Sequence, residues 1–390
     1  MKTLFQSPLD PGFVQNPYPF YDNARSHGDL VYWKDYQKVA AVSHRAVQAL
    51  LKDRRFGREV PAELQRPRPA HLAPWLTVEA HSLLEAEPPR HTRLRALVVR
   101  AFTSRAISAL EPSIRDLSHS LIDRFPDAPF DLLETFCSQV PVITICCLLG
   151  VPEGMSPDLL RWSHAMVAMY QASRTRETED AAAAAAQDFT DFLDDYIQQR
   201  RSNPRDDLIT RLIAAEEDGE KLSHDELVAT CILLLNAGHE ATVHSLGNGV
   251  KTLLQMGIDP RAHAIDGLIE EILRYDPPLH MFTRYAYEEA ELFGHTFHRG
   301  DEVALLLGAA NRDPSVWADP DRFDPTRPIV TNTSFGGGLH FCVGAPLARL
   351  EMRIALTALF DRCPNLRLCA GPEYSNTYHF RGLTRLMVRV

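Results

Sequence analysis

The chain has 390 residues, of which 45% are hydrophobic and 24% are charged, and these values are typical of a globular protein. Its formal net charge is −10, which disfavours a nucleic-acid partner because phosphate binding needs clustered positive charge. The longest apolar runs, residues 140–152 and 227–237, are shorter than the roughly 20 residues that cross a bilayer. We therefore expect neither a nucleic acid nor a membrane as partner.

The cysteines and the first residues indicate the compartment. There are seven cysteines, an odd number, and none forms a C-x-x-C pair. This pattern is typical of free thiols in a reducing compartment. Residues 1–8 have one basic residue but no sustained apolar segment after it, so we expect no secretion signal. A cytoplasmic protein is the resulting expectation.

Taken in chain order, the predicted elements are mostly helical. Strand-like segments occur near the N-terminus, at residues 30–33 and 39–42, and late in the chain, at 282–287, 291–297, 303–306 and 386–390. Helical periodicity dominates residues 101–276, including an amphipathic helix that starts in the alanine run 181–186. We predict a single domain over residues 1–390, mainly α (α+β), with a large helical body and a small β-rich part built from both ends of the chain.

One predicted helix should run through the middle of that body. Ser223 and Glu226 form a capping box, and residues 227–237 carry no charge on any face, which indicates burial all round. Continued to residue 254, the helix has about 30 residues and is about 45 Å long. Its interior contains Gly238 and Glu240. Because both residues cost stability there, we expect something to offset them.

A glycine-rich segment, residues 335–344, precedes a predicted helix over 345–360 and contains Cys342. The glycines permit left-handed backbone and close approach to a flat group. The positive end of the following helix should favour the Cys342 thiolate over the thiol. With no second cysteine nearby, zinc and iron–sulfur sites are poorly supplied, whereas a single axial thiolate suits haem iron.

This segment resembles the haem-binding loop of the cytochrome P450 family, F-G-x-G-x-H-x-C-x-G followed by L-A-R, at each of those positions. The resemblance implies the P450 fold, with its long central helix and small β-rich subdomain, and haem b as cofactor. It also implies that Cys342 is the iron ligand and that Phe335, Gly336 and Gly344 belong to the cofactor-binding loop.

Other segments resemble further P450 motifs. Glu271 and Arg274 match the family's E-x-x-R pair, whose third partner the resemblance places at Arg322. The family's haem propionates are bound by basic residues, and the matching positions here are His91, Arg95, Arg284 and His340.

The resemblance implies a monooxygenase that inserts one atom of dioxygen into a C–H bond of a small, largely apolar organic substrate. The chain has no flavin or nicotinamide fingerprint, so electrons should come from a separate ferredoxin or flavodoxin served by an NAD(P)H-dependent reductase. The basic residues expected on the partner's side are Arg100, Arg105, Arg349 and Arg353. An acidic partner would be steered by them, although solvated surface arginines explain them equally well.

The chain departs from the family in the central helix, where proton delivery uses the pattern A/G-G-x-D/E-T. Glu240 matches the acid, but Ala241 occupies the threonine position, and a methyl group cannot donate a hydrogen bond. Thr242 is turned about 100° around the helix and should not simply replace it. A substrate hydroxyl with ordered water, His239 or another side chain, or a peroxide-driven or non-hydroxylating reaction would account for the change; we favour the first.

Two different classes of protein remain as alternatives. His239, Glu240 and His244 approach the zinc motif H-E-x-x-H, but five-residue spacing places the histidines about 140° apart, and the sequence offers no third ligand. The other alternative is a haem protein that binds a ligand or transfers electrons without oxygenation.

By resemblance, the expected substrate pocket contains an adaptable apolar set: Met166, Met169, Leu234, Ala237, Met281, Phe282 and Phe380.

Overall fold

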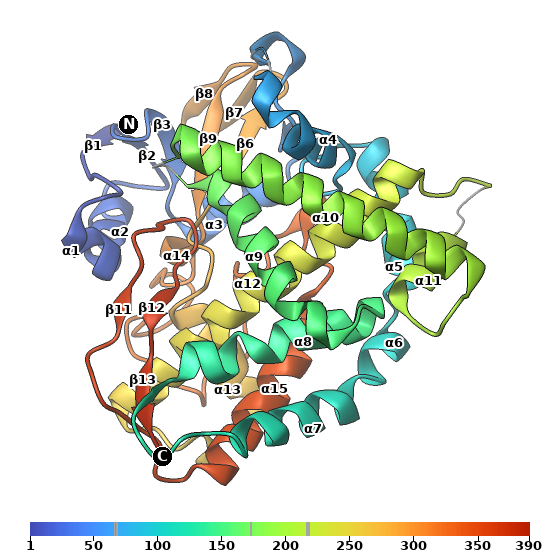
Figure 1. The fold of residues 1–390 in the computed structure, drawn as a ribbon. Helices are drawn as coiled ribbons and strands as arrows, with labels where there is room; N and C mark the ends of the chain where they lie inside the picture. Colours follow the sequence, from blue (N-terminus) through green and yellow to red (C-terminus); the bar gives the residue numbers. More distant parts are fainter. Residues whose placement is uncertain (66, 68, 172–173, 216–218) are drawn as a thin grey trace.

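The computed structural model describes residues 1–65, 67, 69–171, 174–215 and 219–390, and it is built mainly of helices (Figure 1). The α-helices are α1 (Pro11–Gln15), α2 (Tyr18–Arg25), α3 (His44–Lys52), α4 (Ala73–His81), α5 (Arg90–Ala101), α6 (Ser104–Ser108), α7 (Glu111–Ile122), α8 (Gln139–Leu149), α9 (Ser156–Val167), α10 (Arg176–Ser202), α11 (Leu208–Ala214), α12 (His224–Met256), α13 (Ile265–Tyr275), α14 (Leu307–Ala310) and α15 (Ala345–Arg362). Short 3-10 turns connect several of them: η1 (Ala62–Leu64), η2 (Ala70–Leu72), η4 (Glu153–Met155), η5 (Ala168–Tyr170), η6 (Pro260–Ala262) and η7 (Gly338–His340). A π-helical turn, η3 (Leu133–Cys137), precedes α8.

Most of the strands come from residues 2–57 and 281–389, and β5 lies between them in the chain. They are β1 (Lys2–Leu4), β2 (Leu30–Trp33), β3 (Lys38–Ala41), β4 (Phe56–Gly57), β5 (Phe130–Asp131), β6 (Met281–Ala286), β7 (Ala290–Leu292), β8 (His295–Phe297), β9 (Glu302–Leu306), β10 (Arg367–Leu368), β11 (Glu373–Tyr374), β12 (Leu383–Arg385) and β13 (Met387–Arg389). The largest sheet has the order β1-β2-β3-β9-β6-β4. Its centre joins the two ends of the chain, because β3 pairs in parallel with β9, with Val39 opposite Val303. The predicted mainly helical body with a small β-rich part is confirmed.

The central helix α12 has 33 residues and crosses the body diagonally in Figure 1. The Ser223–Glu226 capping box satisfies its first amides, and Gly257, at φ 64°, ends it in the left-handed conformation that glycine adopts most easily. It packs against α8, α4, α15 and α13. Because its side chains are buried on several sides, α12 is the core element around which the other helices are placed.

One predicted strand is in fact a hairpin. Residues 291–297 were expected to be continuous, but β7 and β8 pair in antiparallel register, with Ala290 opposite Phe297. Phe293 and Gly294 have φ values of 51° and 71°. Two consecutive positive φ values are typical of a two-residue hairpin turn, so the chain reverses where the sequence pattern indicated continuity.

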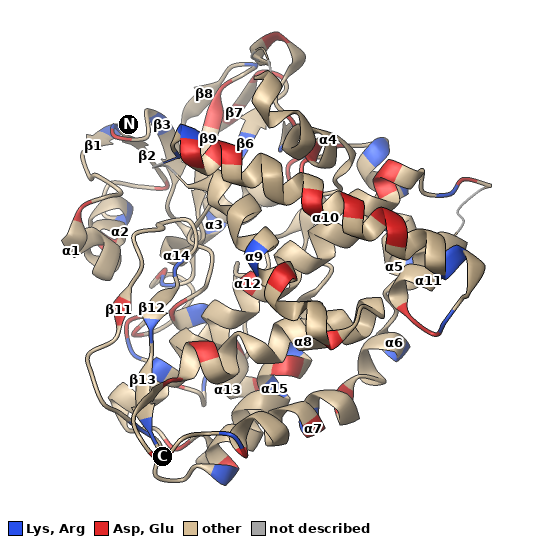
Figure 2. Ribbon diagram, in the orientation of Figure 1, with Lys and Arg blue, Asp and Glu red and all other residues tan. Residues whose placement is uncertain are grey.

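The acidic charge is unevenly distributed. Figure 2 shows Asp and Glu residues at several positions along α10. Within the described ranges, no helix combines the length and apolar character that a membrane span requires.

Candidate functional site

The Cys342 loop is held in one shape by its glycines. Gly336 and Gly338 have φ values of 69° and 63°, and a Cβ on Gly338 would lie 2.2 Å from the backbone oxygen of Leu51 at the end of α3. The Cys342 amide donates to the Phe335 carbonyl oxygen over 3.0 Å. The loop therefore packs closely on α3 and presents Cys342, an exposed residue, just before α15 begins.

The Cys342 thiol is not ionised by its surroundings alone. Crowding of the sulfur by protein raises its pKa, and this outweighs the opposing hydrogen bonds from the amides of Gly344 and Ala345 and the charges of Arg95 and Arg349. The amide donors expected at the helix terminus are present and lower the pKa of the thiol, but their effect is smaller than that of burial. A bound metal ion would have to displace the proton, as metal ions do at cysteine sites.

Two histidines and an arginine lie beside this loop. The rings of His91, on α5, and His340 have centroids 4.5 Å apart, and His340 Nε2 lies 3.0 Å from Glu87 Oε1. Arg95 Nη2 donates to the Phe341 carbonyl oxygen over 2.7 Å. Burial, together with the charges of His340 and Arg95, lowers the pKa of His91 to about 4. His91 is therefore a neutral hydrogen-bonding group at neutral pH, and Arg95 brings a positive charge to this side of the loop.

A second pair of cations adds to this charge. Arg284, on β6, is buried, and among the described residues its side chain makes one hydrogen bond, a 2.8 Å donation from Nη1 to the Thr283 carbonyl oxygen. Burial and the nearby charge of Arg58 lower the pKa of Arg284 to about 10. Arg58 pairs with Glu85, and both arginines lie over the Phe282 ring. Arg58 was missed in the sequence analysis, because it lies outside every motif recognised there.

The middle of α12 has a stripe that protein does not cover. Ala237 is exposed, and Leu233, Ala241 and His244 are only partly buried, whereas most of the helix around them is buried. These positions are three or four residues apart, so they share one face. A methyl at Gly238 would meet nothing closer than Ile145, at 3.4 Å. Protein packing therefore does not require the small residues of this stretch.

Comparison with known proteins decides the family. A family model described as Cytochrome P450 matches residues 12–256 and 259–373. The chain belongs to the cytochrome P450 family.

Similar P450s are bacterial. "Cytochrome P450 107B1" from Saccharopolyspora erythraea is 40% identical over 319 residues, covering 79% of this chain and 76% of the relative. "Vitamin D(3) 25-hydroxylase" from Pseudonocardia autotrophica is 36% identical over 395 residues, covering 96% and 94%. Among solved structures, P450BioI in complex with an acyl carrier protein ligated to hexadec-9Z-enoic acid has a TM-score of 0.91 and 33% identity, covering 97% of this chain and 99% of that one.

The residues of this P450 fit haem, the cofactor of the family. Haem needs one axial thiolate and cations for its two carboxylates. Cys342 is accessible at the loop, and the neighbouring cations outnumber their acidic partners. Within the described part of the chain, His91 Nδ1 and Arg58 Nε are buried without any hydrogen-bond partner. Buried polar atoms normally find partners, so these nitrogens are suited to donating hydrogen bonds to propionate oxygens.

The E-x-x-R pair of the P450 is buried and bidentate. Arg274 Nε and Nη2 donate to the two Glu271 oxygens over 2.7 and 2.8 Å. The third partner differs from the expected Arg322: the Arg327 guanidinium lies 3.4 Å from Glu271 Oε1, whereas Arg322 contributes its backbone carbonyl to Arg274 over 3.2 Å. The loop after residue 320 places the side chain of residue 327 at the pair, and short-range sequence spacing does not reveal this.

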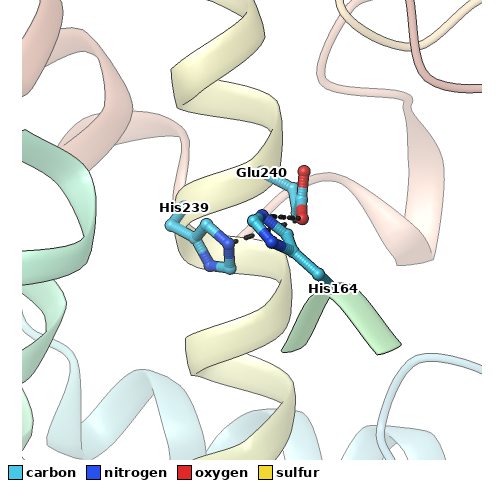
Figure 3. Close-up of side chains that lie close together, drawn as sticks. All are labelled: His164, His239 and Glu240. Carbon is cyan, nitrogen blue, oxygen red and sulfur yellow. Dashed lines mark ion pairs between the residues drawn. The ribbon is translucent and has the colours of Figure 1, made fainter. Parts of the chain in front are cut away.

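Glu240 lies among three histidines, two of which, His164 and His239, are drawn in Figure 3. Its Oε1 is 3.2 Å from His164 Nε2 and 3.5 Å from His239 Nε2, and its Oε2 is 3.5 Å from His244 Nε2. Burial by itself raises the pKa of Glu240, but the neighbouring His239 and the charges of the three histidines lower it to about 2. Glu240 is therefore a carboxylate at neutral pH. Sequence reasoning missed His164, which comes from α9.

Thr242 faces away from the open stripe. It is buried, and its hydroxyl donates to the Gly238 carbonyl oxygen over 3.3 Å. Ala241, by contrast, is partly exposed on the stripe itself. The structure thus provides no hydroxyl from residue 242 on the face where the family threonine would stand.

The residues expected to line the substrate pocket do not form one apolar cluster. Leu234 and Met166 belong to the main helical core, and Met166 Sδ lies 3.7 Å from Asn236 Nδ2 of α12. Met281 packs in a second core, Phe282 borders a third and Met169 lies in a fourth. Phe380 is partly buried and forms an isolated bridge with Leu279. Ala237 is the exposed member of the set.

Proposed function

We propose that this P450 hydroxylates a largely apolar organic molecule that carries its own hydroxyl group and binds along the open stripe of α12. The observation that carries the proposal is the pairing of Glu240 with a bare methyl at Ala241 on that stripe. Two similar proteins act on or carry apolar molecules, as their names state: a vitamin D(3) hydroxylase and a P450 bound to a fatty-acyl carrier protein.

Each residue would act through its charge or its shape. Bound haem supplies oxygen activation and the oxidation of the C–H bond. Cys342 would hold the iron, while His91, Arg95, Arg284 and His340 would neutralise the two carboxylates. Ala237 and Ala241 leave room for the substrate.

Protons from solvent would pass along ordered water held by the Glu240 carboxylate to the substrate's hydroxyl. Because its pKa is low, Glu240 stays ionised and would orient this water as a hydrogen-bond acceptor. The methyl of Ala241 leaves a position without a donor, and Thr242 is already bonded to Gly238. A hydroxyl on the substrate fills this position, and the enzyme would then react efficiently only with molecules that bring one.

Electrons would come from a separate ferredoxin or flavodoxin with its NAD(P)H-dependent reductase, in the cytoplasm. P450s of bacteria use such redox partners together with organic substrates. The free state of all seven cysteines is compatible with a reducing compartment.

A substrate pair and one variant test the proposal. Substrates are first identified by their shift of the Soret band, and the best is compared with its deoxy analogue. For the wild type, we expect product formed per NAD(P)H consumed to fall about tenfold or more with the deoxy analogue, the size expected for one lost proton-transfer partner. Ala241→Thr should restore product yield with the analogue and change little with the hydroxylated substrate.

The outcomes separate the alternatives. A wild type that is poorly coupled with every substrate and much improved by Ala241→Thr would refute substrate assistance. Efficient turnover with hydrogen peroxide but not with NAD(P)H and redox partners would favour a peroxide-driven enzyme. Reduction and ligand binding without any product would indicate an electron carrier.

A further inference from the structure

The cluster around Glu240 has the composition of a metal site. His164 on α9 and His239 on α12 both direct Nε2 toward Glu240 Oε1, at 3.2 and 3.5 Å (Figure 3). One ligand atom from each of the three residues lies within 4.8 Å of the others. The sequence showed His239 and Glu240 next to each other but offered no third ligand, and the packing of α9 on α12 supplies it.

His239 is prepared to be a ligand. Its Nδ1 lies 2.9 Å from the Leu235 carbonyl oxygen, and since a carbonyl can only accept, Nδ1 must carry the proton. Nε2 of the neutral ring then presents a lone pair. This atom is buried without a hydrogen-bond partner in the described structure, and it faces a carboxylate oxygen. A backbone hydrogen bond that fixes the second ring nitrogen is the usual arrangement at histidines that bind metals.

Two lone pairs that face each other in a buried place repel unless a cation lies between them. A proton on Nε2 is one such cation. A divalent ion is another, and it binds neutral imidazole and carboxylate.

The spacing fits a small transition-metal ion. The bonds from zinc to nitrogen and carboxylate oxygen are about 2.0–2.1 Å long. In tetrahedral geometry, such bonds place the ligand atoms about 3.4 Å apart. The two measured distances to Glu240 Oε1 bracket this value. His244 Nε2, 3.5 Å from Oε2, can hold the other carboxylate oxygen. The side chain of His164 is 62% exposed, which leaves the ion a route of entry.

We propose that His164, His239 and Glu240 form a binding site for a divalent transition-metal ion of the Zn²⁺ type, with a fourth position left for water. Two histidines and one glutamate with an open position are a known zinc ligand set. The site excludes Glu240 from proton transfer while it is occupied, because the carboxylate then binds the ion. The binding itself does not rest on the proposed function.

Calorimetric titration of the haem-loaded protein with ZnCl₂, in a buffer that does not chelate metals, tests the site. We expect one equivalent to bind to the wild type and the affinity to fall at least ~10-fold in His164→Ala and in Glu240→Gln, as for the loss of one ligand. His71→Ala is the matched control, because His71 also pairs with a glutamate, Glu179, at 2.7 Å, but belongs to η2. It should bind zinc like the wild type.

Crystals soaked in ZnCl₂ give a readout independent of affinity. Anomalous scattering at the zinc edge should show a peak within bonding distance of both histidines. The proposal is overturned if the wild type binds no zinc, if His164→Ala binds it as tightly as the wild type does, or if the peak lies elsewhere. The Soret band of each variant shows whether the protein has folded around its haem.

Discussion

At the scale of single residues, the site of this P450 is defined by buried polar groups whose hydrogen-bonding capacity the described residues do not fully satisfy. Arg284 is buried with one backbone acceptor, and His91 Nδ1 and Arg58 Nε have none among the described residues. Such groups destabilise a protein by themselves. Their cost is offset when two carboxylates are bound between them, so binding of the cofactor and completion of the fold are coupled.

This coupling predicts the behaviour of Arg284→Gln. Loss of one charge-assisted hydrogen bond, worth about 1.5–3 kcal/mol, should speed haem loss about 10- to 100-fold. Transfer of haem to an excess of apomyoglobin, followed by absorbance, measures it. Arg284→Lys should recover part of the retention, whereas Arg299→Gln, at an exposed arginine paired with Glu63, should not differ from the wild type. Unchanged transfer by Arg284→Gln would show that this residue does not hold a propionate.

At the scale of elements, α15 carries a buried acid into its contact with α12 and α8. Glu351 has no hydrogen-bond partner for either carboxyl oxygen in the described structure. Burial raises its pKa to about 8, although the hydroxyls of Thr144 and Thr242 beside it oppose the shift. Glu351 is therefore protonated at neutral pH, and its neutral form allows the three helices to pack together.

The sign of the resulting pH dependence follows from linkage. The unfolded chain releases the Glu351 proton above an ordinary pKa of about 4.3, whereas the folded protein keeps it up to about pH 8. The free energy of unfolding should thus decrease by up to about 1.4 kcal/mol per pH unit between these values. Glu351→Gln should remove this slope, so its stability relative to the wild type rises with pH. Guanidinium unfolding from pH 5 to 8 measures the free energy of unfolding, and Glu111→Gln, at an exposed residue, is the control. If the free energy of unfolding of Glu351→Gln ran parallel to that of the wild type over this pH range, the raised pKa of Glu351 would be contradicted.

An element was predictable from the sequence when the interactions that determine it join residues close together along the chain. The start of α12 was predictable because its capping box lies within four residues. The β7–β8 hairpin was missed because Phe293, an unusual residue at positive φ, hides the turn. The partner of Glu271 and the approach of His164 to Glu240 depend on loop and helix packing, and a single sequence carries no direct signal for such contacts.

At the scale of the whole molecule, Asp276 joins distant parts of the chain. It accepts from Tyr18 over 2.8 Å, from Arg381 over 2.7 Å and from Lys251 over 3.2 Å. These residues belong to α2, the C-terminal segment and α12. Although burial opposes ionisation, the charges of Arg381 and Lys251 hold the pKa of Asp276 well below its ordinary value.

Removing the negative charge should therefore destabilise the entire fold. Asp276→Asn leaves two buried cations uncompensated, and we expect a loss of about 3–5 kcal/mol, measured by urea unfolding at pH 7. In the wild type, the contribution of Asp276 should persist above pH 4 and disappear only as the pH falls through its low folded pKa. Asp259→Asn, at an exposed pair with Arg261, is the control. A loss as small as the control's would show that the network does not join the ends of the chain energetically.

The distribution of charge over the whole molecule also affects how a redox partner approaches. Arg349 and Arg353, on the expected docking face, are engaged by acids, because Arg349 pairs with Glu270 and Arg353 with Asp266. Exposed Arg105, on α6, should therefore carry much of the steering of an acidic ferredoxin.

Arg105→Glu should slow reduction several-fold at low ionic strength, and the difference should shrink toward 0.5 M salt because screening shortens the range of the field. Stopped-flow reduction under carbon monoxide measures the rate. Arg385→Glu makes the same charge change on β12, on the far side of the molecule from α6 in Figure 1. Equal slowing by both variants would attribute the effect to net charge rather than to a docking face at α6.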